Sequence, residues 1–301
     1  MKKRISDFDL KAYLESKRKA VDRALEALWR AHPPTLLVKA MRYSLMAGGK
    51  RLRPILCIAS AEAVGGSQDE VLPVACALEL IHTYSLIHDD LPAMDNDDLR
   101  RGIPTSHKVF GEAIAILAGD ALLTAAFEEL ASNALARNRD LRRWMEIIHI
   151  IARAAGFSGM VEGQMIDMAS EGKLIPVEEL ESMHRLKSGA LIEASIYSGA
   201  LLGGANKAEA EALKEFGRHI GLAFQVTDDI LDVEGDSKIT GKRTGTDKKR
   251  QKATYPALLG LNEAKLKGRE LVEKALQSLE IFDKKGDPLR AIAYYVIERK
   301  R

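Results

Sequence analysis

Residues 73–98 read PVACALELIHTYSLIHDDLPAMDNDD, a long apolar stretch that ends in a cluster of carboxylates. Stretches rich in alanine and leucine favour helix, so we expect a helix over Pro73–Met94. Carboxylates at the end of an apolar helix need partners, because an unpaired buried carboxylate is costly. This stretch therefore predicts both a buried helix and a polar site at its end.

The rest of the chain continues the helical pattern. The 301 residues contain nine prolines, none of them between Pro104 and Pro176 or between Pro176 and Pro256. Strand signals are weak, since β-branched alternation with Asn-Gly or Asp-Gly turns is missing. We predict an all-α, single-domain antiparallel helical bundle over residues 1–301. Its helices are expected at Leu10–Ala31, Thr35–Met46, Arg53–Val64, Pro73–Met94, Gly111–Ala136, Arg139–Ala169, Val177–Gly203, Lys207–Leu231, Tyr255–Ile281 and Leu289–Arg299.

Composition excludes several classes of protein. A chain that is 46% hydrophobic and 29% charged is typical of a soluble globular protein and not of a disordered one. The net charge of +2 gives no reason to expect nucleic acid as a partner. Two cysteines, Cys57 and Cys76, are too few for a disulfide scaffold or a multi-cysteine zinc site. Asp120 and Glu79 interrupt the longest apolar runs, so no membrane span is expected. The charged N-terminus resembles no signal peptide, and a cytoplasmic protein is expected.

Two acidic clusters lie on otherwise apolar helices. The first occupies residues 88–98 and the second, FQVTDDILD, occupies residues 224–232. At about 100° per residue, Asp228 and Asp232 share one face of a helix. Asp89 and Asp95 would lie about 240° apart on an ideal helix. Pro92 stands between them, and a bulge or a helix end there would bring Asp95 back toward Asp89.

Paired carboxylates of this kind suit Mg²⁺, which takes oxygen ligands and is usually held by one or two carboxylates plus substrate phosphates. For either cluster alone, a helix N-cap or a solvated acidic face is an equally good interpretation. The occurrence of both clusters in apolar helices favours a metal site. Its candidate ligands are Asp89, Asp90, Asp95, Asp228, Asp229 and Asp232.

Basic residues accompany the acidic clusters. Residues 48–54, GGKRLRP, place cations beside glycines at a helix start, where free N–H groups also attract anions. Arg100 and Arg101 follow the first acidic cluster, and His184 and Lys187 share a helix face. Residues 234–253 form an expected mobile basic loop that contains Lys242 and Lys252. Cations and carboxylates in this combination predict a diphosphate substrate held through metal ions and bases.

These motifs, taken in order, resemble the trans-isoprenyl diphosphate synthases, and within them the bacterial farnesyl diphosphate synthase (geranyltranstransferase) branch. The resemblance runs over essentially the whole chain. It is carried by GGKRLRP at 48–54, SLIHDDLPAMD at 85–95, DLRRG at 98–102, AGDAL at 118–122, GQMID at 163–167, HRLKSG at 184–189, FQVTDDILD at 224–232, GK at 241–242 and KATYP at 252–256.

The resemblance implies antiparallel helices around a deep cavity, a homodimer, about three Mg²⁺ ions and a head-to-tail condensation. It implies that an allylic substrate, dimethylallyl or geranyl diphosphate, is held through metals on Asp89, Asp95 and Asp228, and that isopentenyl diphosphate is the second substrate. Residues implied around the allylic diphosphate and the reacting carbons are Arg100, Lys187, Ser188, Gln225, Lys242 and Lys252. Those implied for isopentenyl diphosphate are Lys50, Arg53, His82 and Arg101. Catalytic roles are implied for Lys187, Ser188, Gln225, Asp89 and Asp228.

The chain departs from the family pattern at two positions. Ser188 stands where the family usually has threonine, which keeps the hydroxyl group. Asn96 stands where many bacterial members have another aspartate, which weakens the expectation of a supporting contact there. The implied mechanism is ionisation of the allylic C–O bond, attack by the isopentenyl double bond and loss of a proton to the released diphosphate.

Other functions compete with this interpretation. A metal phosphohydrolase would need further histidine ligands, and the seven histidines form no such set. A terpene cyclase would not need Lys50, Arg53 and His82. An inactive regulatory subunit would be expected to lack one of the acidic motifs. Among synthases, a geranylgeranyl diphosphate synthase is the alternative.

Product length is predicted from Tyr84. It lies five residues before Asp89, about 7.5 Å along a helix, and is followed by the small Ser85. In the resembling family an aromatic residue here accompanies fifteen-carbon products. We therefore expect farnesyl diphosphate as the main product, with Tyr84 as the floor of the pocket for the growing chain. An ordinary core aromatic is the alternative.

Overall fold

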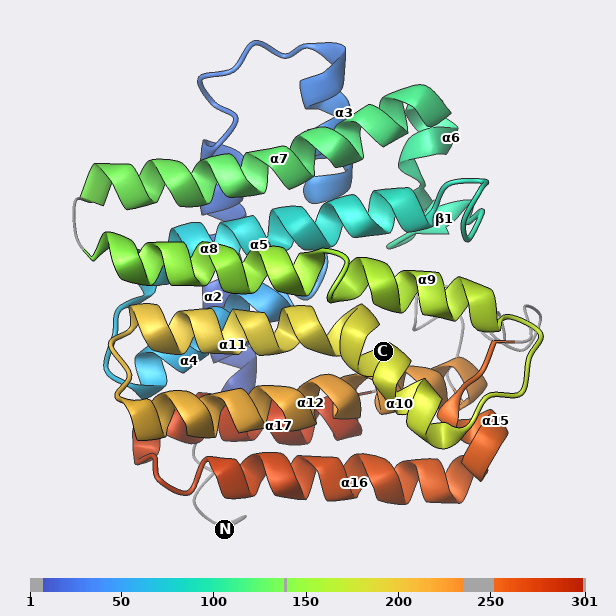
Figure 1. Ribbon diagram of the computed structural model, residues 1–301. Coiled ribbons are helices and arrows are strands. Elements are labelled where there is room, and N and C mark those ends of the chain that lie inside the picture. Colours follow the sequence, from blue (N-terminus) through green and yellow to red (C-terminus); the bar gives the residue numbers. More distant parts are fainter. Residues whose placement is uncertain (1–7, 138–139, 235–251, 300–301) are drawn as a thin grey trace.

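The computed structural model describes residues 8–137, 140–234 and 252–299 (Figure 1). Within them the chain is helical, and its strands are the antiparallel pair β1 (Leu99–Arg100) and β2 (Ile103–Pro104). The α-helices are α2 (Leu10–Ala27), α3 (Leu36–Leu45), α4 (Leu52–Ala63), α5 (Gln68–Asp89), α6 (Ser106–Phe110), α7 (Glu112–Arg137), α8 (Leu141–Ala155), α9 (Met160–Ser170), α10 (Val177–His184), α11 (Ala190–Leu202), α12 (Lys207–Glu234), α15 (Tyr255–Leu259), α16 (Leu261–Ser278) and α17 (Asp287–Glu298). The chain also forms a π-helical turn, η1 (Arg185–Gly189), and a 3₁₀ turn, η2 (Lys284–Gly286). The prediction of an all-α fold is confirmed.

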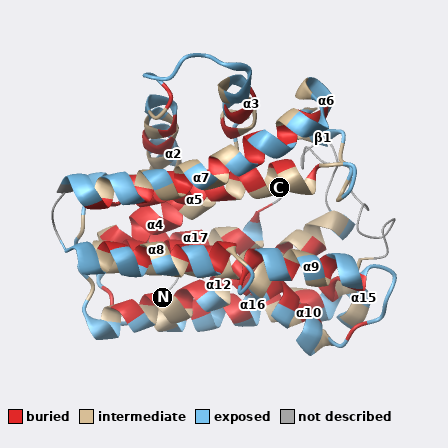
Figure 2. Cartoon of the chain, turned by 45° about the horizontal axis from the view of Figure 1, so that its top comes forward, coloured by how far each residue is buried: buried red, intermediate tan, exposed pale blue. Residues whose placement is uncertain are grey.

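The long helices lie side by side in the order α7, α8, α11, α12 and α16 (Figure 1). Their buried residues form two hydrophobic clusters, one that includes most of α5 and one that includes α12 and α16. Helices α4 and α11 contribute side chains to both clusters, so the clusters share helices. Exposed residues lie on the outer faces of the bundle (Figure 2). The single domain over residues 1–301 stays a prediction.

Helix α5 is buried on nearly all sides, which accounts for its predominantly apolar sequence. By length and composition alone it is the one described helix that could cross a membrane, but 72% of its apolar window is buried inside the fold. The structure therefore places it as a core helix.

Several predicted helix bounds were wrong. Helix α5 begins five residues earlier than Pro73, where Glu70 accepts a hydrogen bond from the Ser67 N–H, and it ends at Asp89 instead of Met94. The helix predicted over Arg139–Ala169 is two helices, α8 and α9, because the chain turns at Gly156 and Gly159. The helix predicted over Tyr255–Ile281 is divided at Gly260, whose φ of 83° is a left-handed conformation that favours glycine.

Candidate active site

The first acidic cluster lies where α5 ends. The helix stops at Asp89, and the N–H of Asp95 donates a hydrogen bond of 2.8 Å to the Asp89 carbonyl. The Asn96 N–H donates to the Leu91 carbonyl at 3.0 Å, and Asn96 takes a φ of 48°. The chain therefore folds back beyond Pro92. Of the two predicted routes, a helix end is the one that returns Asp95 to Asp89.

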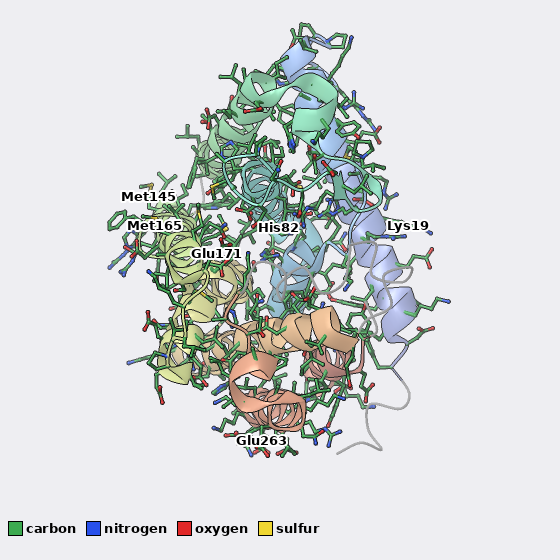
Figure 3. The ribbon with its side chains drawn as sticks, turned by 90° about the vertical axis from the view of Figure 1, so that its right-hand side faces the viewer. Lys19, His82, Met145, Met165, Glu171 and Glu263 are labelled. Atoms are coloured by element: carbon green, nitrogen blue, oxygen red, sulfur yellow. The ribbon has the colours of Figure 1, made fainter. Side chains whose placement is uncertain are left out.

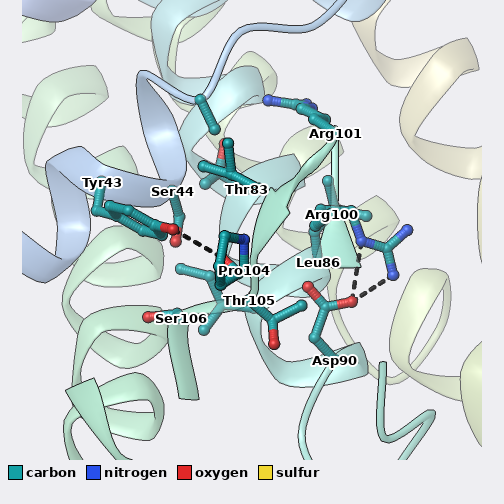
Figure 4. Close-up of a pocket in the computed structure, with 13 residues that line it drawn as sticks. Tyr43, Ser44, Thr83, Leu86, Asp90, Arg100, Arg101, Pro104, Thr105 and Ser106 are labelled. Carbon is teal, nitrogen blue, oxygen red and sulfur yellow. Dashed lines mark hydrogen bonds and ion pairs between the residues drawn. The ribbon is translucent and has the colours of Figure 1, made fainter. Parts of the chain in front are cut away.

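Asp90, next to Asp89, is paired with an arginine. It is 3% exposed, and its Oδ1 accepts a hydrogen bond of 2.9 Å from Arg100 Nε (Figure 4). Arg100 Nη2 also lies 3.1 Å from Asp97 Oδ2. The predicted metal ligand Asp90 thus holds Arg100 in place in this structure. The predicted substrate residue Arg100 lies beside the acidic turn as a result.

Asp89 has a perturbed carboxyl group. Burial raises the pKa of Asp89 to about 6, and the charges of Asp95 and Asp90 add to this effect, whereas Lys187 opposes it. A divalent cation between these carboxylates would reverse the shift by favouring their charged forms. Among the described residues no group of three histidine, cysteine or acidic side chains could hold a metal by itself. This donor set fits Mg²⁺, which keeps waters and uses few carboxylates together with substrate phosphates.

Asp167 connects the acidic turn with two predicted lysines. Its Oδ2 lies 2.6 Å from Lys187 Nζ and 3.1 Å from Lys252 Nζ. Lys252 Nζ in turn lies 3.3 Å from Asp95 Oδ1. Burial alone would raise the pKa of Asp167, but the two lysines outweigh it and lower that pKa. Residues 95, 167, 187 and 252 therefore meet in one cluster of alternating charge.

A π-helical turn and a glycine bring Lys187 to Asp167. Lys187 and Ser188 lie in η1, and π-turns of this kind are frequent at functional sites. Helix α9 passes so close to η1 that a Cβ on Gly163 would stand 2.1 Å from the Lys187 backbone nitrogen. Asp167 lies four residues after Gly163, on the same face of α9. The close approach at Gly163 thus places the Asp167 carboxylate next to Lys187.

The second acidic cluster lies on α12 and faces two ways. Asp229 is 2% exposed, and it accepts hydrogen bonds from Gln225 Nε2 at 3.0 Å and from the Tyr255 N–H at 3.0 Å. Ser188 Oγ donates to Gln225 Oε1 at 2.8 Å. This predicted metal ligand therefore orients the Gln225 amide toward Ser188. The two predicted catalytic residues, Ser188 and Gln225, are in contact.

Asp228 and Asp232 lie on the more open side of α12. The Asp228 Oδ1 accepts a hydrogen bond of 2.8 Å from Arg299 Nη2, and its side chain is 42% exposed. The guanidinium of Arg299 also lies 3.9 Å from the centroid of the Phe224 ring. Asp232 is half-buried. The charge of Asp228 is thus paired with that of Arg299 in this structure.

The residues predicted for isopentenyl diphosphate lie near one another. His82 sits among the inner side chains of the bundle, whereas Lys19, Met145 and Glu263 lie at its outer edge (Figure 3). Burial lowers the pKa of His82 well below its usual value, and the charges of Arg53 and Arg101 lower it further. A neutral His82 beside these arginines can donate one hydrogen bond to a diphosphate oxygen. Lys50 is exposed at the edge of this group, and Lys242 lies outside the described residues.

The predicted chain-length residues lie on α5. Tyr84 is 7% exposed, and its ring meets His88 edge-on with centroids 5.7 Å apart. Burial raises the pKa of Tyr84 to about 12, and the charge of Asp89 contributes to the shift. Ser85 Oγ donates to the His82 carbonyl at 2.9 Å. Tyr84 is therefore a buried ring close enough to Asp89 to sense its charge.

Sequence reasoning assigned no role to three residues of this site. Asp167 belongs to the GQMID motif at 163–167, but no pattern in the sequence indicates that it pairs with lysines. Arg299 is predicted only as the end of a helix, and nothing in its spacing indicates the contact with Asp228. Glu79 interrupts an apolar run, and a carboxylate at such a position is the signal in the sequence that it has buried partners.

Comparison with known proteins agrees with this geometry. Residues 34–292 match the family described as Polyprenyl synthetase. The chain is 48% identical over 299 residues to the farnesyl diphosphate synthase of Geobacillus stearothermophilus, covering 98% of this chain and 99% of the relative. It is 47% identical over 296 residues to a chloroplastic geranylgeranyl pyrophosphate synthase of Catharanthus roseus, covering 98% and 82%. A solved FPP/GFPP synthase of Zymomonas mobilis superimposes with a TM-score of 0.83 at 41% identity, covering 96% of this chain and 98% of that one.

Proposed function

Because the chain belongs to the polyprenyl synthetase family, we propose that it condenses isopentenyl diphosphate head-to-tail with dimethylallyl or geranyl diphosphate to give mainly farnesyl diphosphate. The observation that carries the proposal is the cluster of Asp95, Asp167, Lys187 and Lys252 at the end of α5. It places carboxylates and lysines together, and a diphosphate with its counter-ions needs both.

The proposed reaction breaks the allylic C–O bond, forms a C–C bond to isopentenyl diphosphate and releases a proton and diphosphate. Mg²⁺ held by Asp89, Asp95 and Asp228 would neutralise charge on the leaving diphosphate. Lys187 and Lys252 supply further positive charge at the same place. The oxygens of Ser188 and Gln225 can stabilise positive charge on the allylic carbons without a strong nucleophile.

Isopentenyl diphosphate would bind on the other side of α5, to Lys50, Arg53, His82 and Arg101. Arginine side chains present forked donors that match diphosphate oxygens, which supports this assignment. The released diphosphate is the proposed acceptor of the proton. A terpene cyclase would not need the residues proposed to bind isopentenyl diphosphate, and an inactive regulatory subunit would not need both acidic clusters.

The fifteen-carbon product is proposed from the buried ring of Tyr84. A geranylgeranyl diphosphate synthase is the second candidate, because a relative that is 47% identical over nearly the whole chain bears that name. The two candidates differ in how far the chain grows along α5 before it meets an obstruction.

The proposal includes a homodimer in the cytoplasm. A groove of about 680 Å³ runs between α3, α7 and Trp29, which follows α2, and is lined mainly by apolar side chains. Leu117, on its wall, is 56% exposed, and Leu37 is 38% exposed. An apolar surface of this kind supports pairing with a second copy. The free, buried thiols of Cys57 and Cys76 are compatible with a reducing compartment.

Incubation of the purified protein with labelled isopentenyl diphosphate and each allylic diphosphate tests the proposal. With Mg²⁺ present, we expect chains that stop mainly at fifteen carbons. Failure to extend any allylic diphosphate would refute the condensation, and chains that stop at twenty carbons would refute the farnesyl product alone. Sedimentation at micromolar concentration tests the dimer.

A further inference from the structure

The proposed chemistry makes no use of a carboxylate that is buried in the middle of α5. Glu79 is 1% exposed and lies between the buried side chains of Leu78 and Leu80. An ionised carboxylate in such surroundings is very costly unless cations are paired with it. The groups that face Glu79 therefore indicate what this residue does.

Arg51 is the first of these groups. Its Nη1 donates to Glu79 Oε1 at 2.7 Å, its Nε donates to Asp22 Oδ1 at 2.8 Å and its Nη2 donates to the Leu45 carbonyl at 2.7 Å. Its side chain is 1% exposed, and every nitrogen of the guanidinium is bound within the protein. Arg51 thus ties α2, the end of α3 and α5 together, and its buried guanidinium is committed to these contacts within the protein.

Arg101 is the second group. Its Nη2 lies 3.8 Å from the same Glu79 Oε1, and its Nη1 donates to the Gly48 carbonyl. A Cβ on Gly49 would stand 2.7 Å from Arg101 Cζ, so the guanidinium lies directly against this backbone. Glu79 therefore contacts one arginine from the loop that precedes α4 and one from the turn between β1 and β2.

Both segments have backbone that needs external support. Arg51 takes a φ of 50° and Arg101 a φ of 55°, which are left-handed conformations that cost energy in residues with a side chain. Such conformations persist where surrounding contacts hold them. Lys50 adjoins Arg51 and Arg53 follows two residues later, so the positions of both depend on how Arg51 is held.

We propose that Glu79 is a positioning residue for isopentenyl diphosphate, acting through its contacts with Arg51 and Arg101. The buried carboxylate holds both segments in one arrangement, so that Lys50, Arg53 and Arg101 converge on the diphosphate. This inference rests on the proposed function and assigns Glu79 to one of its two substrates. At the proposed allylic site a different carboxylate has the corresponding role, since Asp167 pairs with Lys187 and Lys252.

Replacement of Glu79 by glutamine separates positioning from simple electrostatics. Glutamine has nearly the same shape but no charge, and loss of a negative charge beside arginines would by itself strengthen the binding of an anion. Loss of positioning has the opposite effect, because the arginines are no longer held in their forked arrangement. The direction of the change therefore identifies the role.

The test is the dissociation constant of isopentenyl diphosphate, measured by calorimetry in excess chelator, since this site is proposed to need no metal. We expect Glu79→Gln to weaken binding at least about tenfold, and Glu79→Asp, which keeps the charge, to recover part of the loss. In steady-state assays of Glu79→Gln, the KM of isopentenyl diphosphate should rise together with this dissociation constant. The KM of geranyl diphosphate should change by less than about threefold. Unchanged or tighter binding to a folded Glu79→Gln protein would overturn the proposal, and so would an equal rise in both KM values.

Two further variants keep the test decisive. Glu62→Gln is the matched control, because Glu62 is a half-buried carboxylate paired with Lys17 at the far end of α4, and it should leave isopentenyl diphosphate binding unchanged. If Glu79→Gln does not fold, Asp22→Ala removes one hydrogen-bond partner of Arg51, which lies on an outer helix. It should weaken binding by about twofold to fivefold, and unchanged binding would overturn the inference. Wild-type protein that does not bind isopentenyl diphosphate would instead refute the proposed function.

Discussion

Replacement of Tyr84 by alanine tests whether this ring limits the length of the product. The ring is 7% exposed, so its removal leaves a cavity in the core, which costs about 3–5 kcal/mol of stability. A further prenyl unit has five carbons, and its burial in the vacated space would return roughly 4 kcal/mol at about 0.8 kcal/mol per carbon. The variant should therefore be destabilised alone and recover much of its stability with a twenty-carbon diphosphate bound.

Two measurements check this expectation. Chromatography of the dephosphorylated products should show a shift from fifteen to twenty or more carbons in Tyr84→Ala. Thermal unfolding should show a larger stabilisation by geranylgeranyl diphosphate in the variant than in the wild type. Tyr84→Phe is the matched control, because it keeps the ring and removes only the hydroxyl, and its products should match those of the wild type. A folded Tyr84→Ala protein with wild-type products would show that the chain does not grow toward this ring.

Three further expectations concern the metal site, the second substrate and acid stability. Asp89→Ala or Asp228→Ala should lower turnover by orders of magnitude in a folded protein. Asp98→Ala is the control and should not lower turnover, because the Asp98 side chain is 64% exposed. Normal turnover in the Asp89 or Asp228 variant, or in wild-type protein in excess chelator, would contradict the metal site. Arg53→Ala should raise the KM of isopentenyl diphosphate about 10–100-fold and leave that of geranyl diphosphate nearly unchanged; an equal rise contradicts the assignment. Burial lowers the pKa of His184 to about 3 in the folded protein. As the pH falls below about 6.5, this histidine therefore takes up a proton in the unfolded chain before it does so in the folded protein. The free energy of unfolding should fall by up to about 1.4 kcal/mol per pH unit from pH 6.5 toward 3. Urea titrations should show a shallower decline in His184→Gln, and identical slopes would disprove this contribution.

The fold class could be predicted from the sequence because it depends on local patterns. Long segments without proline, rich in alanine and leucine, and the lack of hairpin signals were enough to predict helices. Their ends were less predictable. Helix α5 ends at Asp89 and not at Met94, because the backbone bonds of Asp95 and Asn96 form a turn that has no distinct composition. The break at Gly260 depends on a positive φ at one glycine among many.

The acidic and basic motifs could also be located from the sequence, because carboxylates and arginines in apolar helices need partners wherever they occur. Their orientation could not. Asp89 and Asp90 are neighbours, yet Asp90 binds Arg100. Asp228 and Asp229 are neighbours, yet Asp229 binds Gln225 and the Tyr255 backbone.

The sequence by itself thus determined that this chain is helical, which residues are chemically active and which family they resemble. Only the tertiary structure decided which of those residues meet. Asp167 pairs with Lys187 and Lys252, and Glu79 pairs with Arg51, across separations of 20 to 85 positions along the chain. The physical reason is that helix periodicity defines the faces of one helix, whereas the face that meets a neighbour is set by packing, such as the close approach at Gly163.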